Sequence, residues 1–235
     1  MILEACLKIS TQTVSSDYRR SFIHSIKEAF KNTEYRGIVL SEERAFKPYT
    51  FSVVFKSVKN ITSEQIDFSG ELAFRFSSII FPMTGYLYNY MKSQNFVTIF
   101  GSEILEKRFK LVQNKRISSR KVEFKILGAA VFTKKNGGMI NLPDDLEESM
   151  NYSLQAKMEY LRKLSENVPA FSPIKVLGKA VKYTRVRHYG GMLDAFRGHL
   201  LLEGDPKVLE FAAQVGIGVR TGQGFGMVKV VREWS

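Results

Sequence analysis

The residues best suited to chemistry in this sequence form a basic stripe in its first helical segment. Arg20, His24, Lys27 and Lys31 recur at intervals of three and four residues. At about 100° per residue, these four side chains share one face of a helix. Histidine exchanges a proton near neutral pH, and the flanking cations can stabilise negative charge. The stripe therefore suits cleavage of RNA, although a plain solvated helix face has the same pattern.

A second segment, near the C-terminus, is rich in glycine. Five glycines fall within the eleven residues from Gly216 to Gly226. Glycine loses much backbone entropy on folding, so this density needs a reason. A phosphate backbone lying against outward-facing amide groups is one reason, and a structural turn is the other. The segment lacks the Gly-Lys-Ser/Thr ending of a phosphate-binding loop, and a strand rather than a helix is predicted to follow it.

A third segment, residues 182–189, interleaves basic and aromatic side chains. Strand alternation places Arg185 and Arg187 on one face with two tyrosines, and His188 on the other face. Such a strand suits stacking on bases and contact with phosphates. An exposed strand with a charged outer face has the same pattern.

Hydrophobic periodicity predicts the elements that position these segments in the first half of the chain. Strands are predicted at residues 2–9, 49–58, 71–79, 95–100 and 103–112, and helices at residues 18–31 and 82–92. Ser15, Ser16 and Asp17 are the candidate N-caps of the first helix. The order is β-α-β-β-α-β, the split βαβ arrangement of ferredoxin-like folds.

The second half repeats this order less clearly. The predicted elements are a strand at 122–133, a turn at 134–138, a helix at 146–166, strands at 175–188 and 192–203, a helix at 206–215 and a strand at 225–233. Asp205 and Pro206 are start signals for the last helix. The sequence thus predicts an α+β protein with two tandem ferredoxin-like (RRM-like) βαββαβ domains, 1–113 and 122–235, joined by a basic linker at 113–121.

Composition narrows the class of partner. The formal charge is +12, and a folded chain this basic usually meets a polyanion, with nucleic acid first and an anionic membrane surface second. The single cysteine, Cys6, excludes an intrachain disulfide and is predicted to be a buried core thiol. His24, His188 and His199 lack metal-site spacing, so no metal is predicted. With no signal or membrane-spanning segment, a soluble, cytoplasmic protein is expected.

Several short motifs resemble those of one protein family. They are Gly204-Asp205-Pro206, Gly216-Ile217-Gly218, the run from Gly222 to Val230, the run from Ala195 to Leu200, and the run from Lys47 to Ser52. Together they resemble the CRISPR repeat-processing endoribonucleases of the RAMP superfamily. The glycine-rich part of the match is shared by RAMP proteins that do not cleave RNA.

The resemblance implies an activity. Members of the family bind one repeat of a CRISPR transcript and cut it without a metal or other cofactor. The 2′-hydroxyl attacks the adjacent phosphate, which leaves a 2′,3′-cyclic phosphate and a 5′-hydroxyl. The alternatives are a RAMP subunit that binds crRNA without cutting it, and a structural protein of a ribonucleoprotein or membrane surface.

The resemblance also assigns candidate catalytic residues. His24 matches a position where members carry a catalytic Tyr or His, and Lys47 matches a catalytic Lys. Ser41 stands where many members carry a His, about six residues before that Lys, and this departure leaves cleavage less certain than binding. His24 then takes the role of base, with Lys47 or Lys27 stabilising charge.

The remaining basic, aromatic and glycine residues of the three segments are the candidates for RNA binding. They are Arg20, Lys31, Arg185, Arg187, His188, Gly218, Arg220, Gly222, Gln223, Gly224, Phe225, Gly226 and Lys229. The expected partner is CRISPR repeat RNA (pre-crRNA), not a membrane. Association with other Cas effector subunits and a homodimer are left open.

Overall fold

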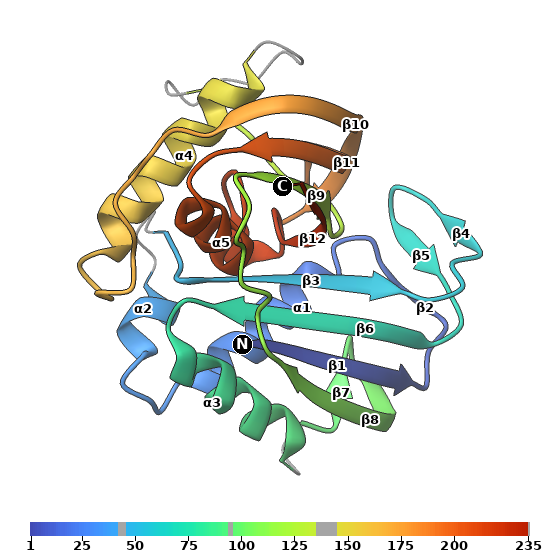
Figure 1. Ribbon diagram of the computed structural model, residues 1–235. Helices are drawn as coiled ribbons and strands as arrows, with labels where there is room; N and C mark the ends of the chain where they lie inside the picture. The colour runs from blue at the N-terminus through green and yellow to red at the C-terminus, as the bar shows by residue number, and fades with distance from the viewer. Residues whose placement is uncertain (42–45, 94–95, 135–144, 235) are drawn as a thin grey trace.

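The described residues form two large antiparallel sheets with helices packed on them (Figure 1). The computed structural model describes residues 1–41, 46–93, 96–134 and 145–234. The predicted turn at 134–138 lies outside these ranges except for Lys134. The α+β class with two ferredoxin-like halves is confirmed by the order of the elements and of the strands.

The N-terminal half contains the six predicted core elements. They are β1 (Ile2–Ile9), α1 (Arg19–Phe30), β3 (Tyr49–Phe55), β6 (Glu71–Ser78), α3 (Phe81–Lys92) and β8 (Ser102–Val112). β1 lies between β6 and β8, and β3 lies outside β6, with every pair antiparallel. Alternate side chains of β6 turn inward, and Phe74 stacks on Phe22 of α1 with ring centroids 5.0 Å apart. This packing fixes α1 on the sheet.

The C-terminal half repeats the arrangement. Its elements are β9 (Lys121–Ile126), α4 (Leu146–Leu161), β10 (Lys175–His188), β11 (Gly191–Glu203), α5 (Pro206–Val215) and β12 (Val228–Trp234). The strand order β10-β11-β9-β12 corresponds to that of the first sheet. Asp205 accepts the amide of Lys207 and Pro206 begins α5, so both predicted start signals are confirmed.

Five short elements are not predicted by the sequence pattern. They are β2 (Thr13–Ser15), α2 (Arg36–Leu40), β4 (Asn60–Ile61), β5 (Gln65–Asp67) and the 3-10 helix η1 (Thr221–Gln223). β2, β5 and β4 pair into a small third sheet. Of the predicted strand at 95–100, residue 95 lies outside the described residues, and within 96–100 only β7 (Thr98–Ile99) is a strand, which forms a hairpin with β8. Elements this short show too few residues for periodicity to reveal them.

Several predicted boundaries are wrong, and positive φ angles explain most of them. The strand expected to reach residue 133 ends at Ile126, before Gly128 at φ 86°. β3 stops before Ser57 at φ 46°, and β12 starts after Gly226 at φ 70°. The helix expected to reach residue 166 ends at Leu161. Cys6, predicted to be buried, is exposed because it faces the outer side of β1.

The two halves are held against each other. Ile80 packs on the hydrophobic cores of both halves, and α5 lies over β3 in Figure 1. Residues 113–120, which connect the sheets, are bound to β12 through Glu233. Its carboxylate accepts the amide of Ser118 at 3.0 Å and pairs with Lys115 at 2.8 Å. These contacts hold the connection between the two sheets against the C-terminal half.

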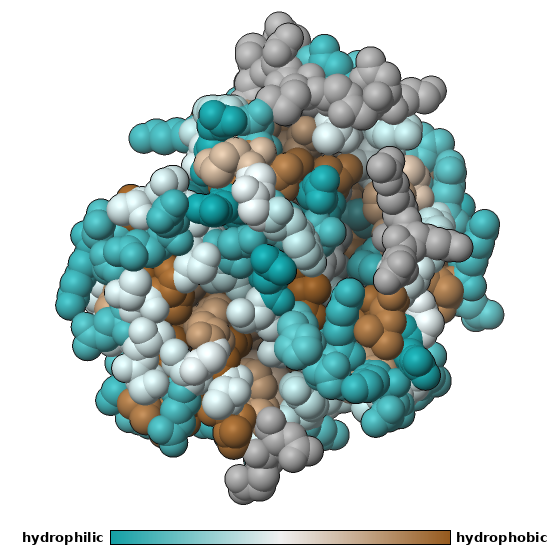
Figure 2. Space-filling model, turned by 180° about the vertical axis from the view of Figure 1, so that it is seen from behind, coloured by the Kyte–Doolittle hydropathy of each residue, from teal (hydrophilic) through white to brown (hydrophobic). Residues whose placement is uncertain are grey.

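The face of the protein opposite the one seen in Figure 1 is hydrophilic over most of its area (Figure 2). Within the described ranges, no helix combines the length and the apolar character needed to cross a membrane.

Candidate functional site

Helix α1 and the glycine-rich loop, residues 216–226, meet although they come from opposite ends of the chain. Arg19 donates from Nε to the carbonyl oxygen of Gly224, 3.1 Å away. Its guanidinium carbon lies 4.6 Å from the ring centroid of Tyr18 and 4.4 Å from that of Phe225. Only 2% of Arg19 is exposed. The contact between the first helix and the loop therefore depends on a residue that the sequence pattern did not single out.

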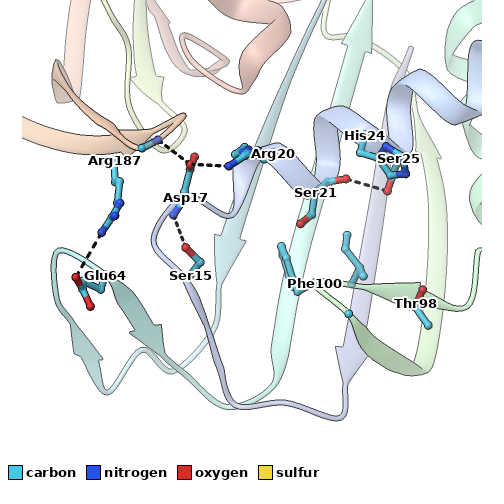
Figure 3. Close-up of a pocket in the computed structure, with 13 residues that line it drawn as sticks. Ser15, Asp17, Arg20, Ser21, His24, Ser25, Glu64, Thr98, Phe100 and Arg187 are labelled. Atoms are coloured by element: carbon cyan, nitrogen blue, oxygen red, sulfur yellow. Dashed lines mark hydrogen bonds and ion pairs between the residues drawn. The ribbon is translucent and has the colours of Figure 1, made fainter.

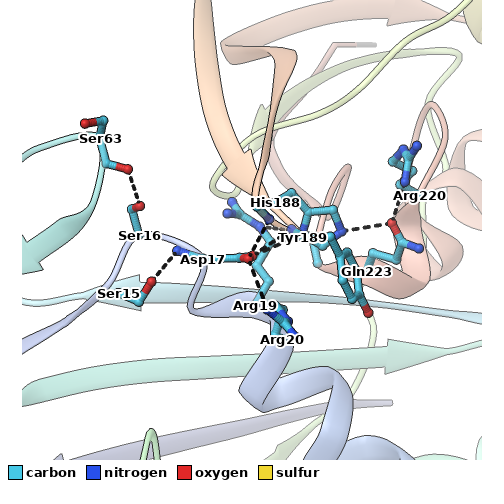
Figure 4. Close-up of polar contacts among 12 residues, drawn as sticks. Ser15, Ser16, Asp17, Arg19, Arg20, Ser63, His188, Tyr189, Arg220 and Gln223 are labelled. Atoms are coloured by element: carbon cyan, nitrogen blue, oxygen red, sulfur yellow. Dashed lines mark hydrogen bonds and ion pairs between the residues drawn. The ribbon is translucent and has the colours of Figure 1, made fainter.

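Asp17 ties the start of α1 to the tip of the β10–β11 hairpin (Figure 4). Its carboxylate accepts the amides of Tyr189, at 3.1 Å, and Gly190, at 3.2 Å. The N-cap of α1 is Tyr18, which makes no side-chain cap bond, so the predicted capping role of Asp17 is wrong. Ser15 and Ser16 do not cap the helix either. Ser15 accepts the amide of Asp17 instead, and Ser16 donates to the carbonyl of Ser63.

His188 and Gln223 join the same hairpin to the loop. His188 Nε2 lies 3.0 Å from Gln223 Oε1, and Arg220 donates to that same oxygen at 3.0 Å. The shared oxygen only accepts, so Nε2 carries the proton. His188 is 4% exposed, and burial lowers its pKa. The predicted RNA-binding residue His188 therefore lies inside the junction, where it positions Gln223 and Arg220.

The glycines of the loop are mostly turned into the protein. The amide of Gly226 donates to Ala129 at 2.8 Å, and the amide of Gly224 donates to Thr221 at 3.2 Å. Gly218, Gly224, Phe225 and Gly226 are all buried. The expectation that these glycines present free amides outward is wrong at Gly224 and Gly226. Three of these glycines, Gly218, Gly224 and Gly226, also have positive φ angles and no room for a Cβ atom.

A buried lysine supports the first part of the loop. Lys157 of α4 is fully buried, and its Nζ donates to the carbonyl oxygens of Gly216 at 2.8 Å and Gly218 at 3.4 Å. Burial lowers its pKa to about 7. In the sequence, Lys157 falls among the inward-facing residues of a predicted helix. A cation at such a position indicates an unusual partner, but the helical period does not reveal that the partners are the carbonyl groups of the loop.

Lys47, Lys27, Ser41 and Gly222 come together beside the exposed part of the loop. Lys47 Nζ donates to the carbonyl oxygens of Ile38 at 2.6 Å and Ser41 at 3.2 Å. Burial, followed by the like charge of Lys27, lowers the pKa of Lys47. A Cβ atom at Gly222 would lie 2.6 Å from Lys47 Cγ, so this glycine permits the close approach of the loop to the lysine.

His24 lies in a separate groove between the two halves (Figure 3). The groove has a volume of about 830 Å³ and is lined by His24 and Arg20 of α1, by Phe100 beside β7, and by Arg187 of β10. His24 is exposed there. Arg20 lies 3.9 Å from the Asp17 carboxylate, and Arg187 lies 3.8 Å from that of Glu64. The groove is thus lined by one histidine and by an arginine from each half, each arginine beside a carboxylate.

Three other candidate RNA-binding residues lie outside the His24 groove. Lys31 follows α1 and pairs with Glu28 at 3.5 Å. Lys229 is exposed on β12 opposite Lys125. Arg185 is exposed on β10 and lies 3.5 Å from Asp194. None of these three lines the groove of His24.

No cluster of three or more His, Cys, Asp or Glu side chains that could hold a metal ion occurs in the described part of the chain. Three protein ligands are the usual minimum for a bound catalytic zinc ion.

Comparison with known proteins gives consistent results. No curated protein sequence matches the chain. Among solved structures, a Cas6-related protein from Pyrococcus furiosus superposes with a TM-score of 0.81 at 17% identity, covering 100% of this chain and 99% of that one. A RAMP protein described as binding different RNA substrates superposes with a TM-score of 0.74 at 19% identity, covering 99% of this chain and 100% of that one. A Cas6 product complex superposes with a TM-score of 0.68 at 15% identity, covering 98% of this chain and 100% of that one.

These identities are low, so the superpositions establish the shared fold. The sequence model described as "CRISPR associated protein Cas6, C-terminal" matches residues 112–230, just over half of the chain. This matched region includes the β10–β11 hairpin, α5 and the whole glycine-rich loop. The chain therefore belongs to the CRISPR-associated Cas6 family.

Proposed function

We propose that this protein binds CRISPR repeat RNA and cleaves it without a metal ion, as in the maturation of crRNA. The observation that carries the proposal is the groove in which His24, Arg20 and Arg187 meet. An exposed imidazole flanked by cations from both halves suits a phosphodiester backbone lying across the domain junction. Solved structures of similar fold include a Cas6 product complex.

The proposed reaction uses the RNA's own hydroxyl as nucleophile. The 2′-oxygen attacks the adjacent phosphorus and the bond to the 5′-oxygen breaks. The leaving oxygen takes a proton from water, so a 2′,3′-cyclic phosphate and a 5′-hydroxyl result. His24 is assigned to accept the 2′-hydroxyl proton. Lys27, one helical turn beyond His24, or Lys47, whose charge acts on that of Lys27, is assigned to stabilise the charge on the phosphorane oxygens.

A second candidate is a subunit that holds crRNA without cutting it. The observation that favours it is the environment of Lys47, whose ammonium group already donates to the carbonyl oxygens of Ile38 and Ser41. Ser41 offers no imidazole at the position where many related enzymes have one. In this case the groove and the loop would bind RNA with the salt dependence expected of the cleaving enzyme, but no product would form.

The deciding experiment incubates the protein with the repeat RNA of its own CRISPR array in excess EDTA under single-turnover conditions. Wild-type protein is expected to yield cyclic phosphate ends. His24→Ala is expected to lower the cleavage rate by about 100-fold or more while leaving the RNA Kd unchanged. His199→Ala is the matched control, because His199 pairs with Glu123 at 2.7 Å outside the groove.

Tight binding without any product would support the binding subunit instead. Cleavage that EDTA abolishes, or a His24→Ala variant that cuts at the wild-type rate, would contradict the assigned mechanism. Absence of any preference for repeat RNA over an unrelated RNA of equal length would contradict both candidates.

A further inference from the structure

Four polar residues form a chain of contacts from the glycine-rich loop to the start of α1 (Figure 4). Arg220 donates from Nη1 to Gln223 Oε1 at 3.0 Å, and the same oxygen lies 3.0 Å from His188 Nε2. On the other side of the ring, His188 Nδ1 lies 3.7 Å from Asp17 Oδ1. Asp17 stands just before α1, the helix that carries His24. The chain therefore connects an exposed cation of the loop with the helix of the proposed base.

The guanidinium group of Arg220 decides in which direction these hydrogen bonds run. A guanidinium only donates, so the Gln223 atom that it contacts must be the amide oxygen. This oxygen also accepts the Nε2 proton of His188, and a neutral ring has no second proton for Nδ1. The loop arginine thus sets the tautomer of a histidine that it does not touch.

The Nδ1 atom of His188 is left without a donor. It is buried and has no hydrogen-bond partner among the described residues, and 3.7 Å is too long for a bond to Asp17. A bare ring nitrogen and a carboxylate oxygen both present lone pairs, so their contact is repulsive, and a buried acceptor without a donor is destabilising. A proton on Nδ1 would convert this contact into a charge-assisted hydrogen bond.

The charges around the ring favour its neutral form. Burial lowers the pKa of His188, the positive charges of Arg19 and Arg220 lower it further, and the bond to Gln223 and the charge of Asp17 oppose them without reversing the direction. The other close neighbours are aromatic: the rings of Tyr189 and Phe225 meet the imidazole edge to face. The Nδ1 atom therefore gains a proton by exchange of tautomers more readily than by charging of the ring.

Backbone strain at Arg220 indicates that its side chain has a task. Arg220 has φ 59°, in the left-handed region, where a glycine would be free of strain. Strained residues of this kind gather at ligand contacts and switches. Arg220 is exposed, and in the part of the chain that the structure describes it pairs with no carboxylate. Its guanidinium is therefore open to an anion from solution.

We propose that Arg220, Gln223, His188 and Asp17 form a switch that couples an RNA phosphate at the loop to the start of α1. The inference rests on the proposed RNA binding and makes His188 a positioning residue that does not touch the RNA. In the free protein, Arg220 holds the Gln223 oxygen toward the ring, and the proton stays on Nε2.

A phosphate bound by the guanidinium takes its donors and releases the Gln223 oxygen. The side-chain amide then turns, so that its NH₂ group donates to Nε2 of His188. The ring releases the Nε2 proton to water and takes a proton from water at Nδ1, so its charge is unchanged. Nδ1 then donates to Asp17, and every polar atom of the ring has a partner.

The switch adds a bond between the β10–β11 hairpin and the start of α1 when RNA is bound. Asp17 already accepts the amides of Tyr189 and Gly190, so His188 becomes a third donor from the same hairpin. The groove of His24 is lined by α1 on one side and by Arg187 of this hairpin on the other. Arg220, which does not line the groove, thus contributes to its order.

The test locates the ring proton by NMR. Bare and protonated ring nitrogens have well-separated ¹⁵N shifts, so a two-bond ¹H–¹⁵N correlation identifies the tautomer. The chain has three histidines, and a background carrying His24→Ala and His199→Ala leaves His188 as the only signal. Spectra of the full-length protein are recorded at about pH 8, where an ordinary histidine is neutral.

Two arginine variants are compared in this background. Arg220→Ala removes the guanidinium that holds the Gln223 oxygen, and Arg220→Gly does the same while relieving the backbone strain. Arg185→Ala is the matched control, because Arg185 is an exposed arginine of the same hairpin that lies beside Asp194 instead of Gln223. Thermal unfolding confirms that each variant is folded.

The background protein and Arg185→Ala are expected to carry the proton on Nε2. Both Arg220 variants should carry it mainly on Nδ1. Repeat RNA added to the background protein should move the proton in the same way, and should cause no further change in Arg220→Ala. The spectrum reports the ring and not a reaction product, so the result does not depend on whether the protein cuts RNA.

Three results would overturn the proposal. A proton that stays on Nε2 in both Arg220 variants would show that Arg220 does not set the tautomer. Protons on both ring nitrogens of the background protein at about pH 8 would mean that the bond to Asp17 is permanent. RNA that binds without moving the proton would disconnect the chain from RNA binding. RNA that does not bind at all would contradict the proposed function, and the Arg220 variants, which need no RNA, distinguish that failure from a failure of the chain itself.

Discussion

Arg19 at the start of the first helix donates a hydrogen bond to the carbonyl oxygen of Gly224 in the last loop, across 205 positions of sequence. The bond joins the two ferredoxin-like halves at the point where the cations of α1 meet the glycine-rich loop. Because the arginine is buried between the rings of Tyr18 and Phe225, the relative position of helix and loop is set by packing as well as by the bond.

Arg19→Lys is expected to destabilise the protein by about 2 kcal/mol or more, because lysine keeps the buried charge but loses the planar group that stacks on both rings. Urea unfolding followed by circular dichroism measures the change. Arg20→Lys, on the exposed side of the same helix, should shift the unfolding free energy by less than about 0.5 kcal/mol. Equal stability of the two variants would mean that Arg19 does not hold the junction.

Gly226→Ala should destabilise the protein by about 3 kcal/mol or prevent folding. Gly226 has φ 70°, and an added Cβ would overlap the carbonyl oxygen of Ile217. Gly85→Ala is the control: no atom lies within 4 Å of its Cβ position, and alanine favours helix α3 by about 0.5–1 kcal/mol. Thermal unfolding compares the two, and an unchanged Tm for Gly226→Ala would refute a structural role for this glycine.

Lys157→Met should remove a specific pH dependence of stability. Burial lowers the pKa of Lys157 to about 7 from the ordinary 10.5, so between these values the unfolded chain binds the proton and the folded chain does not. Its contribution to the unfolding free energy therefore rises with pH in this window, by about 1.4 kcal/mol per unit, and is constant below pH 7.

Urea unfolding of wild-type protein and Lys157→Met at a series of pH values tests this difference. Lys163→Met, at an exposed lysine just after α4, should keep the wild-type slope. If both variants follow the wild-type slope, Lys157 stays protonated throughout the window in the folded protein.

Lys47→Arg should shift the alkaline limb of RNA cleavage to higher pH. Burial and the charge of Lys27 lower the pKa of Lys47, so raising the pH removes its charge earlier than from an ordinary lysine. If the ammonium stabilises the phosphorane, the wild-type rate falls in that range, whereas arginine stays charged. Single-turnover rates between about pH 6 and about pH 10, corrected for uncatalysed hydrolysis, measure the effect. Lys31→Arg should retain the wild-type profile, and identical profiles for all three proteins would exclude Lys47 from the reaction.

Local sequence features determined the order of the elements and the fold class. The periods of the apolar residues in β6 and α1 are set by backbone geometry, so they could be read without knowing what each face packs against. The start of α5 was equally readable, because Asp205 and Pro206 act on the backbone next to them. The same local reading placed His24, Lys27 and Arg20 on one face of a helix. Elements of two to five residues, such as β4 and α2, carry too little pattern to be found in this way.

Only the tertiary structure decided which groups these residues meet. Asp17 could have capped its own helix, but the amides of Tyr189 and Gly190 lie within reach of its carboxylate in the folded protein. The glycine-rich loop could have turned its amides outward, but Gly226 donates to Ala129 and packs against Ile217. A carboxylate or an amide has many possible partners along a chain, and long-range packing selects among them because it brings some within hydrogen-bond distance and leaves others out of reach. The sequence alone could therefore name candidate residues for this protein's site, and the junction of the two halves determined which groups lie beside them.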